Sequence, residues 1–146
     1  MNNQLQHTDH FFNYKKFPIS LLLDNVSGPA NIGSIFRLAD AFNIQKIILC
    51  GKNIVIDSPR VLKTARSTIQ KVDFEVYENP KEAIKAFSDS ERFTTFALEI
   101  TNDSIAIEKM DFSKIKNVVL IGGSEKMGID SELLELADHK ININMF

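Results

Sequence analysis

The chain has 146 residues, of which 44% are hydrophobic and 25% charged, and its net charge of −2 argues against a strongly basic, nucleic-acid-coating protein. This length allows one domain with a substantial core. No apolar run approaches the ~18 residues of a membrane span, and the N-terminus lacks the order of a signal peptide, so we expect no membrane association. Cys50 is the only cysteine, which excludes an internal disulfide and fits a cytoplasmic location. We expect it to be a small buried residue.

Strand-like and helix-like segments alternate along the chain after a polar stretch, residues 1–15, that we expect to be a flexible N-terminal arm. Several strands are continuous apolar runs, which is typical of a parallel sheet covered on both faces. The pattern predicts a doubly wound α/β domain over residues 16–146. The predicted strands are 19–24, 46–50, 73–77, 93–100, 117–121 and 140–145, and the predicted helices are 31–42, 59–70, 80–87 and 130–137.

A first polar motif, Asn31-Ile-Gly33-Ser-Ile-Phe-Arg37, follows the first predicted strand. Asn31 either caps the helix or orients a ligand or an arginine with its amide. Gly33 allows a partner to approach the backbone closely. Arg37 lies opposite the apolar face of the helix, where the simplest interpretation is a solvated pair with Asp40 at i+3.

A second motif, Gly122-Gly123-Ser-Glu125-Lys-Met-Gly128, follows the strand at 117–121. It is neither a P-loop nor a dinucleotide fingerprint, because Lys-Ser/Thr does not follow Gly128 and the glycine spacing differs. A tight strand-to-helix turn would account for the glycines but less well for Glu125. Since ligands of open α/β sheets bind beyond the carboxyl ends of strands, the two motifs predict one composite site.

The two motifs resemble motifs 1 and 2 of the SpoU/TrmH-type RNA 2′-O-ribose methyltransferases of the SPOUT superfamily, and the resemblance to motif 1 extends over residues 24–42. It implies a trefoil-knot fold whose knot segment is incomplete here, because the sequence stops where motif 3 begins; we therefore expect the C-terminal part of the domain to be missing. It also implies S-adenosylmethionine as the cofactor. The implied catalytic residues are Asn31, Arg37 and Glu125, and the implied cofactor-binding residues are Leu98, Gly123, Gly128, Ile143 and Met145.

The segment 58–72 contains basic residues and no acid. Arg60, Lys63 and Arg66 are either a solvated helix face or contacts to RNA phosphates. The resemblance further implies a homodimer in which the arginine of one subunit lies near the cofactor of the other. The three histidines show no metal-ligand spacing, so we expect no metal.

These observations predict an S-adenosylmethionine-dependent 2′-O-ribose methyltransferase acting on structured RNA, with tRNA favoured over rRNA. One alternative is a non-catalytic RNA-binding relative. A second alternative, from another class, is a flavodoxin-like module that binds a small ligand.

Overall fold

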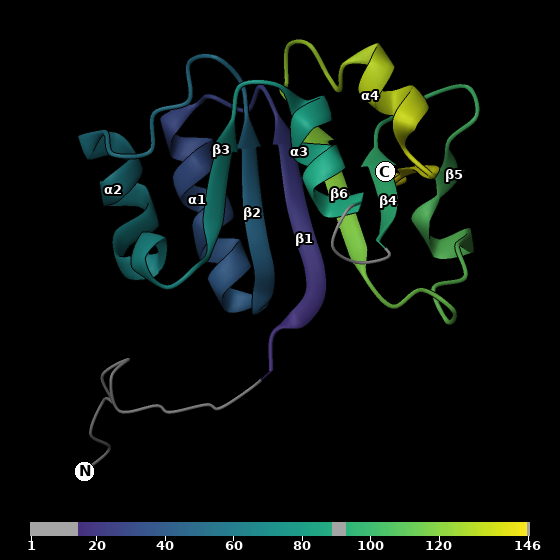
Figure 1. Ribbon diagram of the computed structural model, residues 1–146, viewed down its shortest axis with the longest axis horizontal. Coiled ribbons are helices and arrows are strands. Elements are labelled where there is room, and N and C mark those ends of the chain that lie inside the picture. Colours follow the sequence, from purple (N-terminus) through teal and green to yellow (C-terminus); the bar gives the residue numbers. More distant parts are fainter. Residues whose placement is uncertain (1–14, 89–92, 146) are drawn as a thin grey trace.

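The computed structural model describes residues 15–88 and 93–145, so residues 1–14 of the predicted N-terminal arm, with His7 and His10, lie outside the described residues. Within the described ranges, seven strands form one sheet in the order β3-β2-β1-β6-β4-β7-β5, and every pair in it is parallel (Figure 1). The strands are β1 Phe17–Asp24, β2 Ile44–Cys50, β3 Phe74–Tyr77, β4 Thr94–Leu98, β5 Ile105–Ala106, β6 Val118–Gly123 and β7 His139–Asn142. The helices are α1 Pro29–Ala41, α2 Pro59–Ala65, α3 Pro80–Ser88 and α4 Ser131–Leu136, with short 3₁₀ helices η2 Arg66–Gln70 and η3 Ile107–Lys109.

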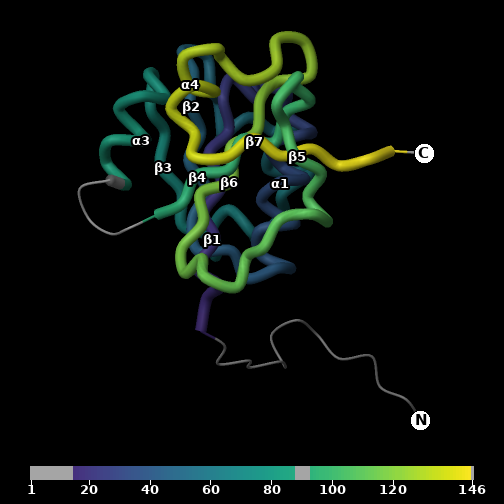
Figure 2. The backbone as a smooth tube through the Cα atoms, turned by 90° about the vertical axis from the view of Figure 1, so that its right-hand side faces the viewer, coloured from purple at the N-terminus to yellow at the C-terminus, as the bar shows by residue number. Residues whose placement is uncertain are grey.

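Helices cover both faces of the sheet, as the apolar strands predict. Alternate residues of one strand point to opposite faces, so Leu23 packs beneath α1 and α2 while Leu22 packs beneath α3 and α4. Figure 2 shows α1 and α3 on opposite sides of the strands. The prediction of a doubly wound, mostly parallel α/β fold is confirmed.

The sheet contains a topological switch point between β1 and β6. The chain after β1 enters α1 on one face, whereas the chain after β6 leads to α4 on the other. The two strands are nevertheless neighbours, and Asp24 pairs in register with Gly123 at their carboxyl ends. Such a divergence of loops is where ligands bind in open α/β sheets.

Most predicted elements are present, with differences at three places. The predicted strand 140–145 stops at Asn142, beyond which Ile143 and Met145 are 52% and 90% exposed. The predicted helix 59–70 is interrupted at Arg66, which has φ 57°, and continues as η2. The strand β5 was not predicted, because two residues cannot display a periodicity.

Two helix starts differ in how they are capped, and one of them begins earlier than predicted. Ser58 caps α2, since its Oγ accepts a hydrogen bond from Val61 N at 3.2 Å. The predicted start of α1 at Asn31 was wrong, because Gly28 is the capping residue and Pro29 is the first helical residue. Asn31 therefore lies in the first turn, and its side chain is not used as a cap.

Candidate active site

A cleft of about 970 Å³ lies at the carboxyl edge of the sheet, the upper edge in Figure 1. It is formed by the loops that follow β1, β2 and β6, by the first two turns of α1, and by one residue after β3. Its lining residues include Asn25, Val26, Asn31, Ser34 and Ile35 from the β1–α1 segment, Lys52, Asn53 and Ile54 after β2, and Gly123, Glu125, Lys126 and Met127 from the end of β6 and the loop after it. The switch point of the fold is therefore hollow, and both polar and apolar side chains line it.

Inside this cleft the two sequence motifs are joined by a hydrogen bond. Asn31 Nδ2 donates to Glu125 Oε1 over 3.3 Å, across 94 residues of sequence. Both side chains belong to exposed residues. The prediction that the two motifs meet at one edge of the sheet is confirmed by this contact.

The loop from Gly123 to Gly128 is closed upon itself. Gly128 N donates to Ser124 O at 2.9 Å, and Met127 N donates to Ser124 Oγ at 3.1 Å. A side chain on Gly123 would place its Cβ 2.2 Å from the carbonyl carbon of Gly128, and Gly128 itself has φ 64°. The tight turn thus accounts for both glycines, and it presents Glu125 toward α1.

Two carboxylates that the sequence analysis missed hold the residues after this loop. Asp24 Oδ2 accepts a hydrogen bond from Asp130 N at 2.9 Å, and Glu99 Oε2 accepts one from Ile129 N at 3.1 Å. Their signal was an acidic residue at or just beyond the carboxyl end of an apolar strand. They anchor the second motif to β1 and to the end of β4.

Burial raises the pKa of the Asp24 carboxyl, and the nearby carboxylate of Asp130 raises it further. The hydrogen bond from Asp130 N opposes the rise but does not cancel it. Asp24 is 1% exposed, so its charge is held at an energetic cost. Cys50, its register partner on β2, is fully buried, and burial raises the pKa of its thiol to about 12. The prediction of a small buried cysteine is confirmed.

Gly33 serves a close helix–helix contact within the chain. A Cβ at this position would lie 2.5 Å from Thr64 Cβ and 2.9 Å from Ala65 N. The close partner expected from the sequence is therefore the C-terminal turn of α2, not a ligand.

Residues 18–146 match the SpoU rRNA Methylase family, nearly the whole chain. The chain belongs to this family. The SpoU resemblance carried by the two motifs is thereby confirmed.

Several relatives share this domain. The chain is 26% identical over 139 residues to rRNA methyltransferase 1, mitochondrial, of Saccharomyces cerevisiae, covering 88% of this chain and 34% of the relative. It is 29% identical over 127 residues to the tRNA (guanosine(18)-2′-O)-methyltransferase of Thermus thermophilus, covering 87% and 63%. The AdoMet-bound rRNA methyltransferase from Sinorhizobium meliloti has the same fold, with a TM-score of 0.79 and 24% identity over 90% of this chain and 49% of that one. The chain thus spans between a third and two thirds of the length of these relatives.

Arg37 of SpoU motif 1 does not line the cleft of its own chain. Arg37 is exposed on α1, and its side chain forms no hydrogen bond or ion pair with residues 15–88 and 93–145. The expected pair with Asp40 is therefore not formed. Arg37 lies one helical turn beyond Gly33, on the side of α1 that approaches α2.

The expected cofactor-binding residues fall into two groups. Gly123 lines the cleft. Leu98, at the end of β4, pairs with Ile141 of β7. In the strand order, β6 separates both of these strands from β1, the strand that leads into α1. Gly128 packs against Glu99, while Ile143 and Met145 extend past the end of β7. The described residues do not bring all five into one pocket.

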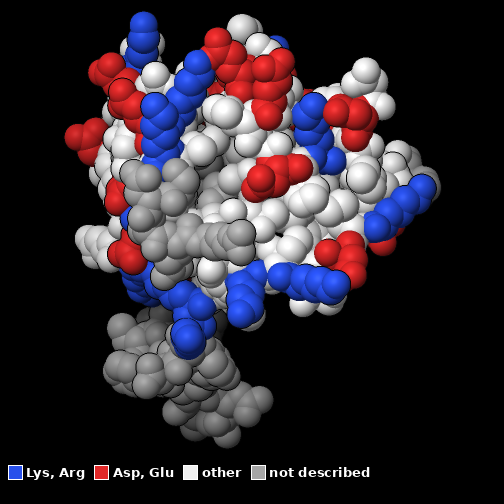
Figure 3. Space-filling view, turned by 45° about the vertical axis from the view of Figure 1, so that its right-hand side comes forward, with Lys and Arg blue, Asp and Glu red and all other residues white. Residues whose placement is uncertain are grey.

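The expected RNA-binding residues Arg60, Lys63 and Arg66 are all exposed along α2 and at its end, and none forms an ion pair with another described residue. The opposite flank of the molecule, toward β4 and β5, mixes both signs, with a row of lysine and arginine side chains along its lower edge (Figure 3).

The described residues form neither a candidate metal site nor a candidate membrane span. No group of three or more His, Cys, Asp and Glu residues there is placed to hold a metal ion. No helix in the same ranges is long and apolar enough to cross a membrane.

Proposed function

We propose that this chain forms the catalytic domain of an S-adenosylmethionine-dependent RNA 2′-O-ribose methyltransferase, with tRNA as the favoured substrate over rRNA. Membership of the SpoU family and the Thermus thermophilus tRNA methyltransferase among its relatives support the activity. The single observation that carries the proposal is the Asn31–Glu125 hydrogen bond, because it joins the two family motifs in one cleft.

The residues present fit the cofactor. Leu98 is half-buried at the end of β4 and Ile143 is half-exposed beyond β7, so apolar side chains are available to an adenine at this edge of the sheet. Gly123, at the end of β6, lines the cleft, so its backbone borders the space beside these side chains. When bound, S-adenosylmethionine supplies a methyl group on a positively charged sulfur.

The reaction requires that a ribose hydroxyl lose its proton to solvent while its oxygen gains the methyl group, whose bond to the positively charged sulfur would break to leave a neutral thioether. A guanidinium stays protonated in proteins, so Arg37 would stabilise the negative charge that develops on this oxygen. Asn31 uses its amide N–H on Glu125, which leaves its Oδ1 as an acceptor that can orient the ribose or the guanidinium. Most of the catalytic effect would come from positioning the reacting atoms.

We propose a homodimer in which Arg37 of one subunit completes the cleft of the other. The support is that Arg37 is exposed, unpaired among the described residues and outside its own cleft. Leu38, beside it, is 55% exposed and would be covered by a partner.

Subunit complementation tests this proposal. Arg37→Ala and Asn31→Ala chains are each expected to be inactive in RNA methylation. An equimolar mixture of the two chains should recover about a quarter of wild-type turnover, because half of randomly formed dimers are mixed and each of these contains one intact site out of two. No recovery, with mixed dimers verified by mass, would contradict the shared site. Full activity of both single variants would contradict the enzymatic role of this cleft.

A further inference from the structure

The cleft extends well beyond the Asn31–Glu125 hydrogen bond, along the loops after β2 and β6. Those loops carry Lys52 and Lys126, both of which line the cleft as exposed residues. The strands β2 and β6 are separated by β1 alone, so the two loops arise about 10 Å apart. The two lysines thus lie on either side of the part of the cleft that is lined by the β1–α1 segment.

Neither lysine forms an ion pair within the described part of the chain, and the carboxylates of Glu78 and Glu125 line the same cleft. Lys16, Lys46, Lys81 and Lys140 each have a carboxylate partner, whereas Lys52 and Lys126 have none among residues 15–88 and 93–145. Two unpaired ammonium groups at the rim of one cleft suit the phosphates of a single strand of RNA.

The position of Lys52 is fixed by the backbone before it. Gly51 has φ 146°, and a Cβ there would lie 2.9 Å from Asn25 Oδ1. Asn25 N also donates to Cys50 O at 2.8 Å. The turn that carries Lys52 is therefore held against the loop after β1.

Between the lysines, the cleft offers surfaces suited to a nucleobase. Met127 is 82% exposed at the tip of the closed loop, and its thioether can lie against the face of an aromatic ring. Asn53 is exposed, and its amide has no hydrogen-bond partner among the described residues, so it can contact a base edge. Unstacked bases of single-stranded loops are recognised by such combinations of contacts.

We propose that this part of the cleft is a subsite for a nucleotide adjacent to the methylated one, with Lys52 and Lys126 binding its flanking phosphates and Met127 and Asn53 contacting its base. The proposal rests on the proposed function, since it assumes an RNA substrate at the Asn31–Glu125 end. It assigns substrate binding to the loop after β2, which lies outside both family motifs.

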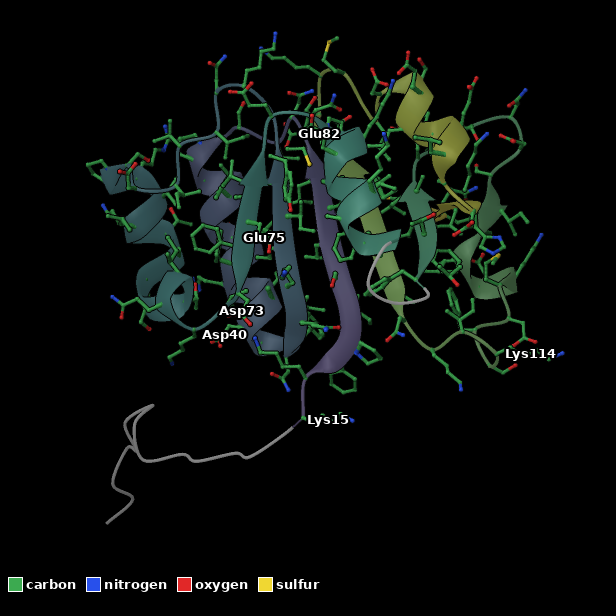
Figure 4. The ribbon with its side chains drawn as sticks, in the orientation of Figure 1. Lys15, Asp40, Asp73, Glu75, Glu82 and Lys114 are labelled. Carbon is green, nitrogen blue, oxygen red and sulfur yellow. The ribbon has the colours of Figure 1, made fainter. Side chains whose placement is uncertain are left out.

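The test is the salt dependence of binding to a single-stranded RNA loop, measured by filter binding with the full-length protein. In the Lys52→Ala/Lys126→Ala variant, the slope of log K against log salt should become shallower by about 1.4, at about 0.7 for each lost phosphate contact. Met127→Ala should weaken binding about two- to tenfold and leave the slope unchanged. The matched control is Lys114→Ala/Lys116→Ala, which removes two exposed lysines at the amino edge of the sheet (Figure 4 labels Lys114).

The outcomes separate this subsite from the activity itself. A wild-type slope in the Lys52/Lys126 variant, or an equal change in the control, would overturn the subsite and leave the proposed function intact. Failure of the wild-type protein to bind RNA at all would overturn both.

Discussion

Under the proposed function, Arg37 is a catalytic residue that contributes little to stability. It has no described partner and lies on an exposed helix face, so its replacement should change the free energy of unfolding by no more than ~0.5 kcal/mol. If it stabilises charge in the transition state, Arg37→Ala should slow methyl transfer by ~100-fold or more. Arg37→Lys should recover little, because an ammonium lacks the planar fork. Single-turnover methylation, with melting temperature alongside, checks this; near-wild-type turnover in the alanine variant would remove Arg37 from the site.

Asp24 makes the stability of the protein depend on pH in an unusual direction. Burial raises the pKa of this carboxyl above 3.8, so between 3.8 and the raised value the folded state holds more protons than the unfolded state. The free energy of unfolding therefore decreases as pH rises through that window, because ionising the buried Asp24 carboxyl destabilises the folded state. In Asp24→Asn, the amide oxygen can still accept from Asp130 N. The stability of this variant relative to wild type should increase as pH rises through the same window and then level off, as measured by urea unfolding.

Asp103 provides a control of opposite sign. Hydrogen bonds from Lys140 and Thr101 lower the pKa of this exposed carboxyl. The ionised Asp103 carboxylate therefore stabilises the folded state above pH 3.8, and this stabilisation is lost as pH falls through the lowered pKa. The free energy of unfolding of Asp103→Asn, relative to wild type, should accordingly decrease as pH rises toward 3.8. Identical pH trends in the two variants would show that Asp24 carries no burial cost.

At the scale of elements, the contact of α1 with α2 depends on Gly33. Gly33→Ala would place a methyl group 2.5 Å from Thr64 Cβ and against the backbone of Ala65. The variant should lose about 1–3 kcal/mol of unfolding free energy through overpacking, although alanine gains ~1 kcal/mol in helix propensity. Gly122→Ala is the control, because its Cβ would meet only Leu23 Cδ2 at 3.6 Å. Urea denaturation measures the free energy of unfolding of both variants. Equal stability of the two would contradict the close contact between α1 and α2.

The sequence predicts this architecture well at the level of elements, because the apolar runs and the two glycine motifs are local signals. It predicts the meeting of Asn31 with Glu125, since both follow strands that end at one edge. It fails where the cause is non-local. Gly33 faces a helix 30 residues away in sequence, and Glu99 acts on Ile129 through tertiary contact, so neither role has a periodic signature.

At the scale of the whole molecule, RNA would contact the surface along α2 as well as the cleft. Replacing Arg60, Lys63 and Arg66 by alanine should weaken RNA binding and make its salt dependence shallower, because phosphate neutralisation dominates nucleic-acid affinity. These residues are exposed, so stability should hardly change. Filter binding over a salt series measures the slope. A slope equal to that of wild type would show that the three residues form an ordinary solvated helix face and do not contact RNA.

Under the proposed function, the two SpoU motifs form one catalytic site through Asn31 and Glu125, whose side chains share a hydrogen bond. A double-mutant cycle on single-turnover RNA methylation, using Asn31→Ala, Glu125→Ala and the double variant of the full-length protein, tests it most directly. Residues that act as a unit give non-additive losses, so the double variant should be about as slow as the slower single variant. Losses that multiply in the double variant, or two single variants with wild-type rates, would contradict the claim.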